Sequence, residues 1–388
     1  MKIAFVSVRG IPNNYGGFEQ FAEYISVGLV KRGHEVTVYS PSYHPYQKDE
    51  YMGVKIKHVY SPESWMGGSV GSFFYDFMCL KDALKNEHFD IIYEAGYTSI
   101  VPAYLWFNVK SRNDVIITTN MDGLENKRSK FNFVTRHFLD WEERMAVKYS
   151  HYLVADNMGI HDYYKMKYDV PSKFLAYGAD IHDDFDEDAP YRYGLRKYWY
   201  YLLVARMEPE NNIEMAIRGY LDSDENKKDD AKPLVVVGKM TTKHGKYLIK
   251  KYSNEKNIKF LGGIYDFKSL DSIRFFSYAY FHGHSVGGTN PSLLEAMASR
   301  CFILAHGNQF NRAVLKENAL YYMNEQDVSN LMNNIDSLQK MHRDAFIEGE
   351  LKDIRENYSW EHLVDQHEEY FKWLIEDKGI HRTQNLKK

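Results

Sequence analysis

The sequence predicts an α/β protein with two doubly wound, Rossmann-like domains that face each other across a cleft. Two observations predict this class. Short apolar runs alternate with longer amphipathic stretches along most of the chain, which is the pattern of β-α-β units and of parallel sheets covered on both faces. The pattern restarts after an acidic stretch near residues 177–193, and 388 residues is the length of two domains of roughly 150 residues each.

The two halves of the chain carry separate series of elements. In the first domain, residues 1–185, short apolar runs predict strands at residues 2–8, 35–40, 54–60, 91–94, 115–119 and 152–155. Amphipathic stretches predict helices at residues 18–32 and 72–86. In the second domain, residues 186–358, we expect strands at 200–205, 234–237, 259–261, 278–282 and 302–305 and helices at 213–221 and 293–299. A final helix is expected at 360–376, and the last twelve residues are polar and expected to be frayed.

Composition and charge exclude several classes of protein. Lys and Arg number 49 and Asp and Glu 53, a formal net charge of −4 that argues against a dedicated nucleic-acid-binding protein. Cys79 and Cys301 are far apart, so neither a disulfide framework nor a cysteine-based zinc site is expected. The apolar start is too short for a secretory signal, and no run approaches the roughly 18 apolar residues of a membrane span. We therefore expect a cytoplasmic protein.

The first candidate site is the loop at residues 9–19, between the first strand and the first helix. Gly16 and Gly17 allow close backbone approach and leave amide groups at a helix start, where an anion can bind. The spacing is not that of a dinucleotide fingerprint, and a tight turn required by packing is an equally good interpretation. Ligands of open α/β sheets bind beyond the carboxyl ends of strands, so the loops after the other strands are candidates as well.

Polar side chains follow the strand expected at residues 115–119. Asn120 and Asp122 come directly after it, and Glu125 and Arg128 follow within the next turns. An amide and a carboxylate at a strand end could hold an acceptor hydroxyl. A helix cap followed by solvated charges would give the same pattern, so both interpretations stay open.

Two further strands end beside groups that could take part in a reaction. Asp156 follows the strand at residues 152–155, with Tyr163 two turns further on, although Asp156 alone is interpreted more readily as a helix cap. Arg206 stands just past the first strand of the second domain, where a guanidinium could bind a diphosphate through two hydrogen bonds. The alternative is a surface arginine paired with Glu208 or Glu210.

The most specific stretch is HGHSVGGTNPSLLEAM, residues 282–297. Pro291 stands where the first residue of a helix is favoured. Thr289, Asn290 and Ser292 would then present side chains and amide groups at a helix N-terminus, where the helix dipole favours a phosphate. Glu295 lies about one turn further in, on the face that a bound ribose would touch.

The same stretch begins with two histidines. His282 and His284 are two residues apart and no third ligand stands nearby, so a metal site is not expected.

At these residues the sequence resembles glycosyltransferase family 4, whose members have two Rossmann-like domains in the GT-B arrangement. The resemblance extends over nearly the whole chain. The loop with Gly16, Gly17 and Glu19 is similar to the N-domain loop of the family. Arg206 stands at its diphosphate-binding arginine, and Glu295 at the second carboxylate of its E-x7-E motif. The final helix, residues 359–378, is similar to the segment that packs back onto the first domain in that family.

The strings DGLENKR, ARMEPENN and HGHSVGGTNPSLLEAM resemble a subgroup of bacterial rhamnosyltransferases that build surface polysaccharides. Two positions depart from the family pattern. Gly287 stands where the first carboxylate of E-x7-E would be, and Asn211 stands near the position of a lysine that contacts the diphosphate. Lys239, Lys243 and Lys246 are candidate replacements for that lysine, and a solvated loop is an equally good interpretation of them.

The resemblance implies a retaining, metal-independent hexosyltransferase that takes a nucleotide sugar, by resemblance dTDP-rhamnose, and a saccharide acceptor. The residues expected to bind the donor are Gly16, Gly17, Arg206, His284, Gly288, Thr289, Asn290, Pro291, Ser292 and Glu295. Those expected to bind the acceptor are Glu19, Asn120, Asp122, Glu125 and Arg128. Those expected to act in catalysis are Asp122, Asp156, Tyr163 and Arg206.

The acceptor in such pathways is a lipid-linked sugar at the inner face of the membrane. Residues 127–149 mix basic and aromatic side chains as a helix on an anionic bilayer would, and an amphipathic core helix fits equally well. The main alternative function is a catalytically silent partner that binds a nucleotide sugar in a polysaccharide assembly system. A phosphorylase would need a pyridoxal-phosphate lysine, which nothing marks, and an oxidoreductase would need the dinucleotide fingerprint that is absent.

Overall fold

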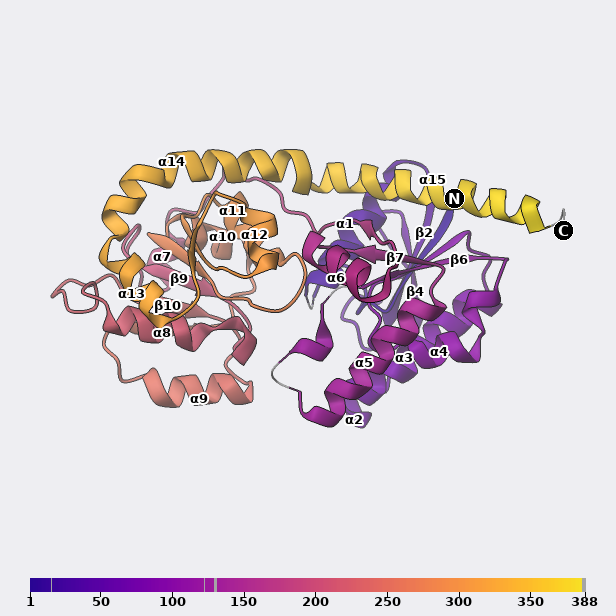
Figure 1. Ribbon diagram of the computed structural model, residues 1–388, viewed down its shortest axis with the longest axis horizontal. Helices are drawn as coiled ribbons and strands as arrows, with labels where there is room; N and C mark the ends of the chain where they lie inside the picture. Colours follow the sequence, from indigo (N-terminus) through magenta and orange to yellow (C-terminus); the bar gives the residue numbers. More distant parts are fainter. Residues whose placement is uncertain (15, 122, 129–130, 386–388) are drawn as a thin grey trace. The chain divides into compact units, whose positions relative to one another are not determined.

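The computed structural model describes the chain except residues 15, 122, 129–130 and 386–388 (Figure 1). Contacts within the chain divide it into two compact units. Unit 1 comprises Met1–Asn126, Asn132–Tyr177 and Trp360–Lys388, and unit 2 comprises Lys127–Phe131 and Gly178–Ser359. Each unit is an α/β domain around a mainly parallel sheet, so the predicted fold class is confirmed.

Unit 1 is built on an eight-stranded sheet in the order β3-β4-β2-β1-β5-β6-β7-β8. Neighbouring strands pair in parallel except β3 and β4, which pair antiparallel. In chain order the strands are β1 (Lys2–Val6), β2 (Glu35–Pro41), β3 (Glu50–Tyr51), β4 (Val54–Val59), β5 (Ile91–Glu94), β6 (Ile116–Asn120), β7 (Tyr152–Ala155) and β8 (Lys173–Phe174).

Helices cover both faces of this sheet. They are α1 (Gly17–Lys31), α2 (Glu63–Met66), α3 (Gly68–Lys85), α4 (Val101–Trp106), η1 (Val109–Ser111), α5 (Phe133–Tyr149), α6 (Met158–Tyr168) and α15 (Trp360–Asn385). Side chains alternate along a strand, so Val6 points to one face, where it packs with Tyr75 of α3 and Tyr104 of α4. Phe5 points to the opposite face and contacts Phe21 of α1. That second face is completed by Phe371 of α15.

The helix α15 packs closely on α1. A Cβ atom on Gly28 would lie 2.4 Å from Cγ2 of Val364, so only glycine fits at that point of α1. The helix continues to Asn385, so the expected end at Glu376 was wrong. No proline interrupts that stretch, and one glycine inside a helix, Gly379, costs only about 1 kcal/mol.

Unit 2 is built on a six-stranded, fully parallel sheet in the order β11-β10-β9-β12-β13-β14. In chain order the strands are β9 (Tyr201–Val204), β10 (Leu234–Val237), β11 (Ile258–Gly262), β12 (Ala279–His282), β13 (Ile303–His306) and β14 (Leu320–Tyr322). The helices are α7 (Ala189–Arg192), η3 (Pro209–Asn211), α8 (Ile213–Asp222), α9 (Lys243–Tyr252), α10 (Phe267–Phe275), α11 (Pro291–Ala298), α12 (Gln309–Leu315), α13 (Glu325–Asn333), α14 (Ile335–Asp353) and η4 (Ile354–Tyr358).

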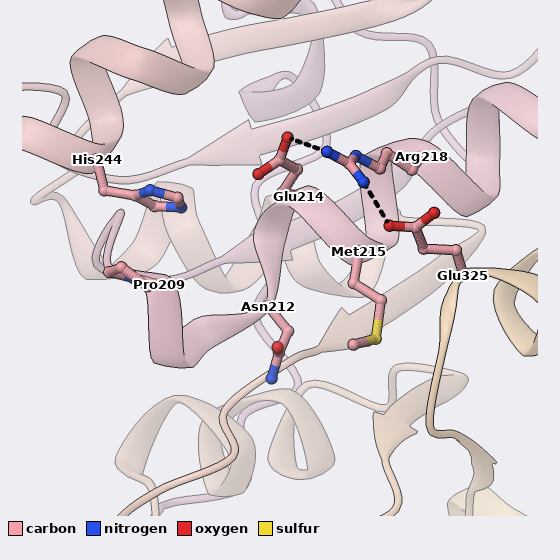
Figure 2. Close-up of a pocket in the computed structure, with 7 residues that line it drawn as sticks. All are labelled: Pro209, Asn212, Glu214, Met215, Arg218, His244 and Glu325. Atoms are coloured by element: carbon pink, nitrogen blue, oxygen red, sulfur yellow. Dashed lines mark hydrogen bonds and ion pairs between the residues drawn. The ribbon is translucent and has the colours of Figure 1, made fainter. Parts of the chain in front are cut away.

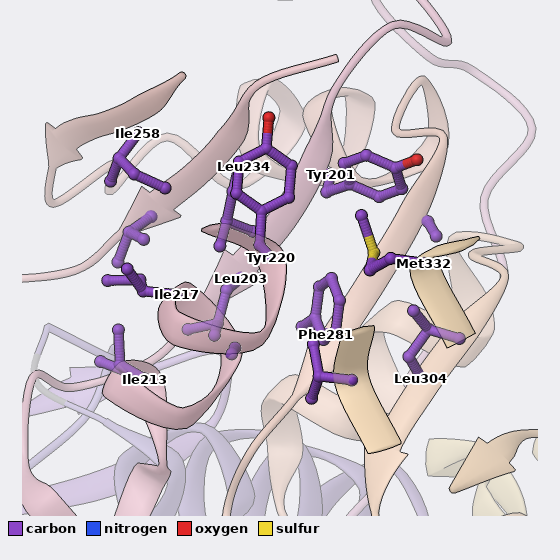
Figure 3. Packing of buried hydrophobic residues seen from close by; sticks show 14 of the residues in the cluster. Tyr201, Leu203, Ile213, Ile217, Tyr220, Leu234, Ile258, Phe281, Leu304 and Met332 are labelled. Carbon is purple, nitrogen blue, oxygen red and sulfur yellow. The ribbon is translucent and has the colours of Figure 1, made fainter. Parts of the chain in front are cut away.

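The main core of unit 2 lies between one face of this sheet and the helices α8, α9 and α13 (Figure 3). Leu203 and Phe281 project from β9 and β12 into it, against Ile217 of α8 and Met332 of α13. Tyr280, the neighbour of Phe281, points to the other face, where it meets α11. All strands run the same way, so the loops after β9, β10, β12 and β13 meet at one edge of the sheet.

None of the helices in the described part of the chain is both long and apolar enough to cross a membrane.

Candidate functional site

The loops after β9 and β12 are held together at the carboxyl edge of the unit 2 sheet. The Asn212 side chain donates to the carbonyl oxygen of Gly283 at 2.8 Å, and the Ser285 amide donates to the Glu210 carbonyl at 3.0 Å. A Cβ atom on Gly283 would lie 2.1 Å from the carbonyl oxygen of Asn211. Glycine is therefore needed at position 283, where the two backbones are in contact. These contacts hold the loop that carries Arg206 against the loop that carries His284.

Arg206 leaves this surface as an exposed side chain, and no acidic side chain of the described residues pairs with it. Its predicted alternative partner, Glu210, is buried and lies 3.5 Å from the guanidinium of Arg128. Asn211 cannot supply the charge of the family lysine, and its side chain donates to the Arg206 carbonyl at 2.6 Å. Asn211 thus shapes the loop that carries Arg206.

Arg128, expected in the first domain with the acceptor-binding residues, belongs by its contacts to unit 2. Burial lowers the pKa of His284, and the nearby His282, Arg206 and Arg128 lower it further. Two guanidinium groups beside one strand end make this edge of unit 2 attractive to an anion. The acceptor-binding role of Arg128 stays a prediction.

The helix α11 begins as predicted, with Pro291 in its first turn and Asn290 as its cap. The Asn290 side chain accepts the Ser292 amide at 3.0 Å, and the Asn290 carbonyl accepts the Leu293 amide at 2.9 Å. The Ser292 amide, which was expected to bind a phosphate, therefore already donates its hydrogen to the cap residue Asn290. Gly287 has a φ of +130°, which favours glycine. The backbone conformation of the loop before the helix therefore explains the glycine at this position.

Glu295, expected to hold a ribose, is fixed by a buried cation that sequence reasoning missed. Arg274 of α10 is 1% exposed and donates to Glu295 Oε2 at 2.6 Å and to Asp271 Oδ1 at 2.7 Å. Ser292 is held as well, because its hydroxyl lies 2.8 Å from that of Tyr280. A single arginine inside a helix carries no spacing signal, so no pattern in the sequence could have identified it.

His282 and His284 stack with ring centres 4.5 Å apart. Burial lowers the pKa of His282 to about 3 and that of His284 well below its ordinary value, so both rings are neutral near pH 7. Within the residues that the structure describes, no three His, Cys, Asp or Glu side chains are grouped to hold a metal ion.

A pocket of about 240 Å³ lies beside the start of α8 (Figure 2). Arg218 bridges Glu214 and Glu325 at 3.0 Å each across it, so its charged groups largely neutralise one another. Pro209 and Asn212 connect the pocket to the loop that carries Arg206.

In unit 1, the glycine loop is tied to α1 through two carboxylates. Glu19 Oε1 accepts the Arg9 amide at 2.8 Å, and Glu23 Oε2 accepts the Asn13 amide at 2.6 Å. Burial raises the pKa of Glu19, which is 3% exposed. Gly16 caps α1 in an extended conformation. The structure thus gives Glu19 a role in holding the loop, and its contact with an acceptor stays a prediction.

The carboxyl edge of the unit 1 sheet carries the other predicted residues. Asn120 ends β6 and is buried, and its Oδ1 has no hydrogen-bond partner among the described residues. Asp156 is buried after β7, and Asn157 rather than Asp156 caps α6 by accepting the Gly159 amide at 2.8 Å. Asp122 lies outside the described residues. Glu125 begins the short helix η2 (Glu125–Lys127) and is half-buried.

Tyr163 is part of a network around Glu143, a fully buried residue of α5. The Tyr163 hydroxyl donates to Glu143 Oε1 at 3.1 Å and accepts from Lys167 at 2.8 Å. Lys167 and Tyr168 also donate to Glu143 Oε1, at 2.7 and 2.6 Å. The network fixes the orientation of the Tyr163 ring, and its role in catalysis stays a prediction.

Sequence reasoning missed three buried carboxylates in unit 1. Asp76 of α3, Glu94 at the end of β5 and Glu142 of α5 are at most 1% exposed, and each has an oxygen without a partner among the described residues. Burial raises the pKa of all three, that of Glu142 to about 9. Ser7, after β1, donates to Glu94 at 2.6 Å. Of these three carboxylates, only Glu94 could have been identified from the sequence as a candidate, because it ends a predicted strand.

Comparisons with known proteins match the two parts of the chain to two different families. Residues 1–180 match the family described as Domain of unknown function (DUF1972), and residues 188–353 match the family described as Glycosyl transferases group 1. No curated protein sequence matches the chain significantly.

Several solved structures resemble the whole chain at low sequence identity. Sucrose-phosphate synthase from Thermosynechococcus elongatus has a TM-score of 0.75 and 13% identity over 97% of this chain and 99% of its own. A glycosyltransferase from Rickettsia africae has a TM-score of 0.70 and 13% identity over 96% and 98%. HepE from Anabaena, solved with UDP-glucose, has a TM-score of 0.68 and 12% identity over 96% and 99%.

These likenesses define the fold: two parallel-sheet α/β domains of the GT-B class. Residues 188–353 carry a Glycosyl transferases group 1 domain on that fold. The chain is a glycosyltransferase of the GT-B type.

Proposed function

We propose that the protein is a retaining glycosyltransferase that moves a sugar from a nucleoside-diphosphate sugar, dTDP-rhamnose, to a saccharide acceptor in surface polysaccharide biosynthesis. The observation that carries the proposal is the exposed guanidinium of Arg206 at the carboxyl edge of the unit 2 sheet, beside the loop that precedes α11. The nucleotide-sugar class is also supported by the HepE structures, which contain UDP, UDP with glucose, or UDP-glucose.

The chemical difficulty is the departure of a nucleoside diphosphate from the anomeric carbon while an acceptor hydroxyl attacks. Negative charge accumulates on the leaving group, so fixed cations and dipoles there should supply most of the acceleration. Arg206 would bind the diphosphate, and the loop of Gly287, Gly288 and Thr289 would supply amide groups, since the first amides of α11 serve its own cap. We propose that no divalent metal is needed.

The sugar and the ribose would be held by groups that are already oriented. Glu295, held by Arg274, would accept a ribose hydroxyl, and His284, a neutral ring near pH 7, would contact the donor without adding charge. The deoxyribose of a dTDP donor offers only its 3′ hydroxyl for that contact.

We propose that unit 1 binds the acceptor at the carboxyl edge of its sheet. Asn120 and Asp156 are buried there at the ends of neighbouring strands, with Tyr163 on the following helix. For a retaining reaction we propose same-face attack, in which the leaving phosphate takes the proton of the acceptor. Asp156 and Tyr163 would then orient the acceptor, and no covalent nucleophile is assigned. A lipid-linked saccharide is the proposed acceptor, with peripheral contact to the membrane.

A screen of nucleotide sugars tests the proposal. The purified protein would be heated with dTDP-rhamnose, dTDP-glucose, UDP-glucose and dTDP. A ligand at 100 times its Kd should add about 2.7 kcal/mol to the free energy of unfolding. We expect dTDP-rhamnose to give the largest stabilisation and to be consumed when acceptor is added.

Each other outcome of the screen has a definite meaning. Greater stabilisation by UDP-glucose would replace the proposed donor. Stabilisation without transfer or hydrolysis would favour the catalytically silent partner. No stabilisation by any nucleotide sugar would contradict the proposed donor site.

A further inference from the structure

One cation, Arg206, serves the proposed diphosphate site at the carboxyl edge of the unit 2 sheet. A diphosphate carries more negative charge than a single guanidinium neutralises, and this charge grows as the sugar departs. A second cation held near Arg206 would therefore strengthen both the binding and the departure of the diphosphate. Arg128 has the position and the surroundings of such a cation.

Arg128 is held against unit 2 although most of the neighbouring chain belongs to unit 1. By its contacts the segment Lys127–Phe131 groups with unit 2, whereas Asn126 before it and Asn132 after it group with unit 1. The Arg128 side chain is only 13% exposed, and its Nη1 lies 3.5 Å from Oε1 of the buried Glu210. A buried carboxylate of unit 2 therefore holds this guanidinium in place.

Glu210 belongs to the loop that carries Arg206. It lies in the short helix η3, whose flanking residues Pro209 and Asn212 are labelled in Figure 2. The Glu210 carbonyl accepts the Ser285 hydroxyl at 2.8 Å and the Ser285 amide at 3.0 Å. Arg128 is therefore anchored where the loop after β9 meets the loop after β12.

His284 lies in the electrostatic field of both arginines. Burial lowers its pKa first, and His282, Arg206 and Arg128 lower it further. The Nδ1 atom of His284 is buried and has no hydrogen-bond partner among the described residues. The His284 carbonyl accepts from Asn311 at 2.9 Å, so the backbone beneath the ring is fixed. A buried nitrogen without a partner, close to two cations, indicates a place for an anionic ligand.

The arrangement of these charges is unfavourable unless an anion is bound. Two guanidinium groups repel each other, and the single carboxylate of Glu210 cannot neutralise both. The ion pair of Arg128 with Glu210 adds little stability by itself, because burial removes water from both groups. An anion bound by Arg128 and Arg206 together would offset the repulsion between them.

Three lysines of unit 2 are the other candidates for the second cation. Lys239 follows β10, and Lys243 and Lys246 stand in the first turn of α9. All three are exposed. An exposed lysine loses rotamer freedom when it binds a ligand, whereas Arg128 is already held by Glu210. Groups that are oriented in advance stabilise a leaving group best, which favours Arg128.

We propose that Arg128 is the second cation of the diphosphate site and binds the diphosphate together with Arg206. Glu210 is then a positioning residue that holds Arg128. The inference rests on the proposed function and deepens it, and it assigns Arg128 to the donor in place of the acceptor role expected from the sequence. The donor site is thus completed by a residue that lies in the chain between two segments of unit 1.

Calorimetric titration with dTDP and with inorganic pyrophosphate tests the proposal. Arg128→Ala should weaken the binding of both ligands at least tenfold, and Arg128→Lys, which keeps the charge, should recover part of this loss. Arg192→Ala is the control, because it removes another arginine of unit 2 that is paired with a carboxylate, and it should bind like the unchanged protein. Unchanged binding in Arg128→Ala, or an equal loss in Lys243→Ala, would overturn the proposal.

Glu210→Gln separates a cation that binds the ligand from an ion pair that only supports the fold. If Arg128 acted only through its pair with Glu210, the two variants Arg128→Ala and Glu210→Gln would weaken binding alike. We expect opposite effects, because Glu210→Gln removes a negative charge from the site and should bind pyrophosphate at least as tightly as the unchanged protein. Thermal unfolding would verify that all variants fold. Equal losses of binding in the two variants would overturn the proposal.

The same measurements distinguish this proposal from the proposed function. Pyrophosphate binding that depends on Arg128, in a protein that consumes no nucleotide sugar, would refute the proposed function and support the role of Arg128. Sugar transfer that depends on Arg206 but not on Arg128 would support the proposed function and overturn the role of Arg128.

Discussion

Glu295 Oε2 and the guanidinium of Arg274 lie 2.6 Å apart, and Arg274 is 1% exposed. The pair connects α11 to α10, because Arg274 also binds Asp271 on its own helix. Removal of the buried cation would break the ion pairs of both carboxylates with it. The orientation of the residue proposed to hold the ribose therefore depends on a side chain that no solvent reaches.

We expect Arg274→Ala to lower the free energy of unfolding by about 3 kcal/mol and to weaken nucleotide binding at least tenfold. The reason is the loss of the cation that orients Glu295. Asp271→Asn is the matched control, because it perturbs the same arginine without removing the Glu295 contact. Urea unfolding and calorimetric titration with dTDP would measure both effects. Nucleotide affinity that is equal in the two variants would show that Arg274 does not position Glu295.

Arg206→Ala should reduce turnover more than a hundredfold. Removal of one donor that stabilises developing negative charge typically costs about 2.7–4 kcal/mol of barrier. The side chain is exposed, so the free energy of unfolding should change by no more than about 0.5 kcal/mol. Arg196→Ala, another exposed arginine of unit 2, should keep normal turnover. Initial rates of donor consumption would decide, and near-normal rates in Arg206→Ala would exclude the diphosphate role.

Tyr163→Phe tests the proposed acceptor site. Tyr168→Phe removes an equivalent hydroxyl from the same carboxylate, since both tyrosines donate to Glu143 Oε1. Each substitution should destabilise unit 1 by about 1 kcal/mol. Only Tyr163→Phe should lower the rate of transfer, by at least tenfold at saturating donor. Equal transfer rates in the two variants would assign Tyr163 to the network around Glu143 alone.

Glu142 predicts a dependence of stability on pH. Burial raises its pKa from 4.5 to about 9, with the charge of Asp76 as a second cause. Folded unit 1 therefore favours the protonated carboxyl, and this contribution is complete below pH 4.5 and is lost as the pH rises toward 9. Glu142→Gln cannot ionise, so its free energy of unfolding should fall less between pH 5 and pH 9. Urea unfolding at both values would measure this.

The control for Glu142 is Glu369→Gln, which changes an exposed glutamate of α15. It should follow the pH profile of the unchanged protein. A Glu142→Gln profile that coincides with the control would mean that Glu142 is ionised in the folded state.

Much of the fold could be predicted from the sequence. Buried parallel strands are short apolar runs on both faces, so β5, β7 and β10 were predicted at their observed limits. The start of α11 was predicted because proline and asparagine have specific places at a helix N-terminus. The elements that were not predicted, including α9, α10, α13 and β14, are short or strongly polar, so their periodicity is weak.

Candidate site residues could be proposed from the sequence only where chemistry and local position coincide. Arg206 and Glu295 follow strands or helix starts, and their positions could be read from the sequence. Arg274 and Glu142 lie inside helices, and tertiary packing alone buries them and brings their partners close. The same packing decides that Asn157 rather than Asp156 caps α6, because either side chain could serve as a cap at that point.

The close approach of Gly28 and Val364 has a consequence for biosynthesis. The ribosome makes α1 early, but α15 emerges only after the whole of unit 2, residues 178–359, has been translated. Until then Tyr93, on the side of the first sheet that α1 covers, lacks its contact with Phe371 of α15. During most of its synthesis the nascent chain therefore exposes apolar surface of unit 1 that α15 buries later. We expect chaperones to bind this surface in the meantime.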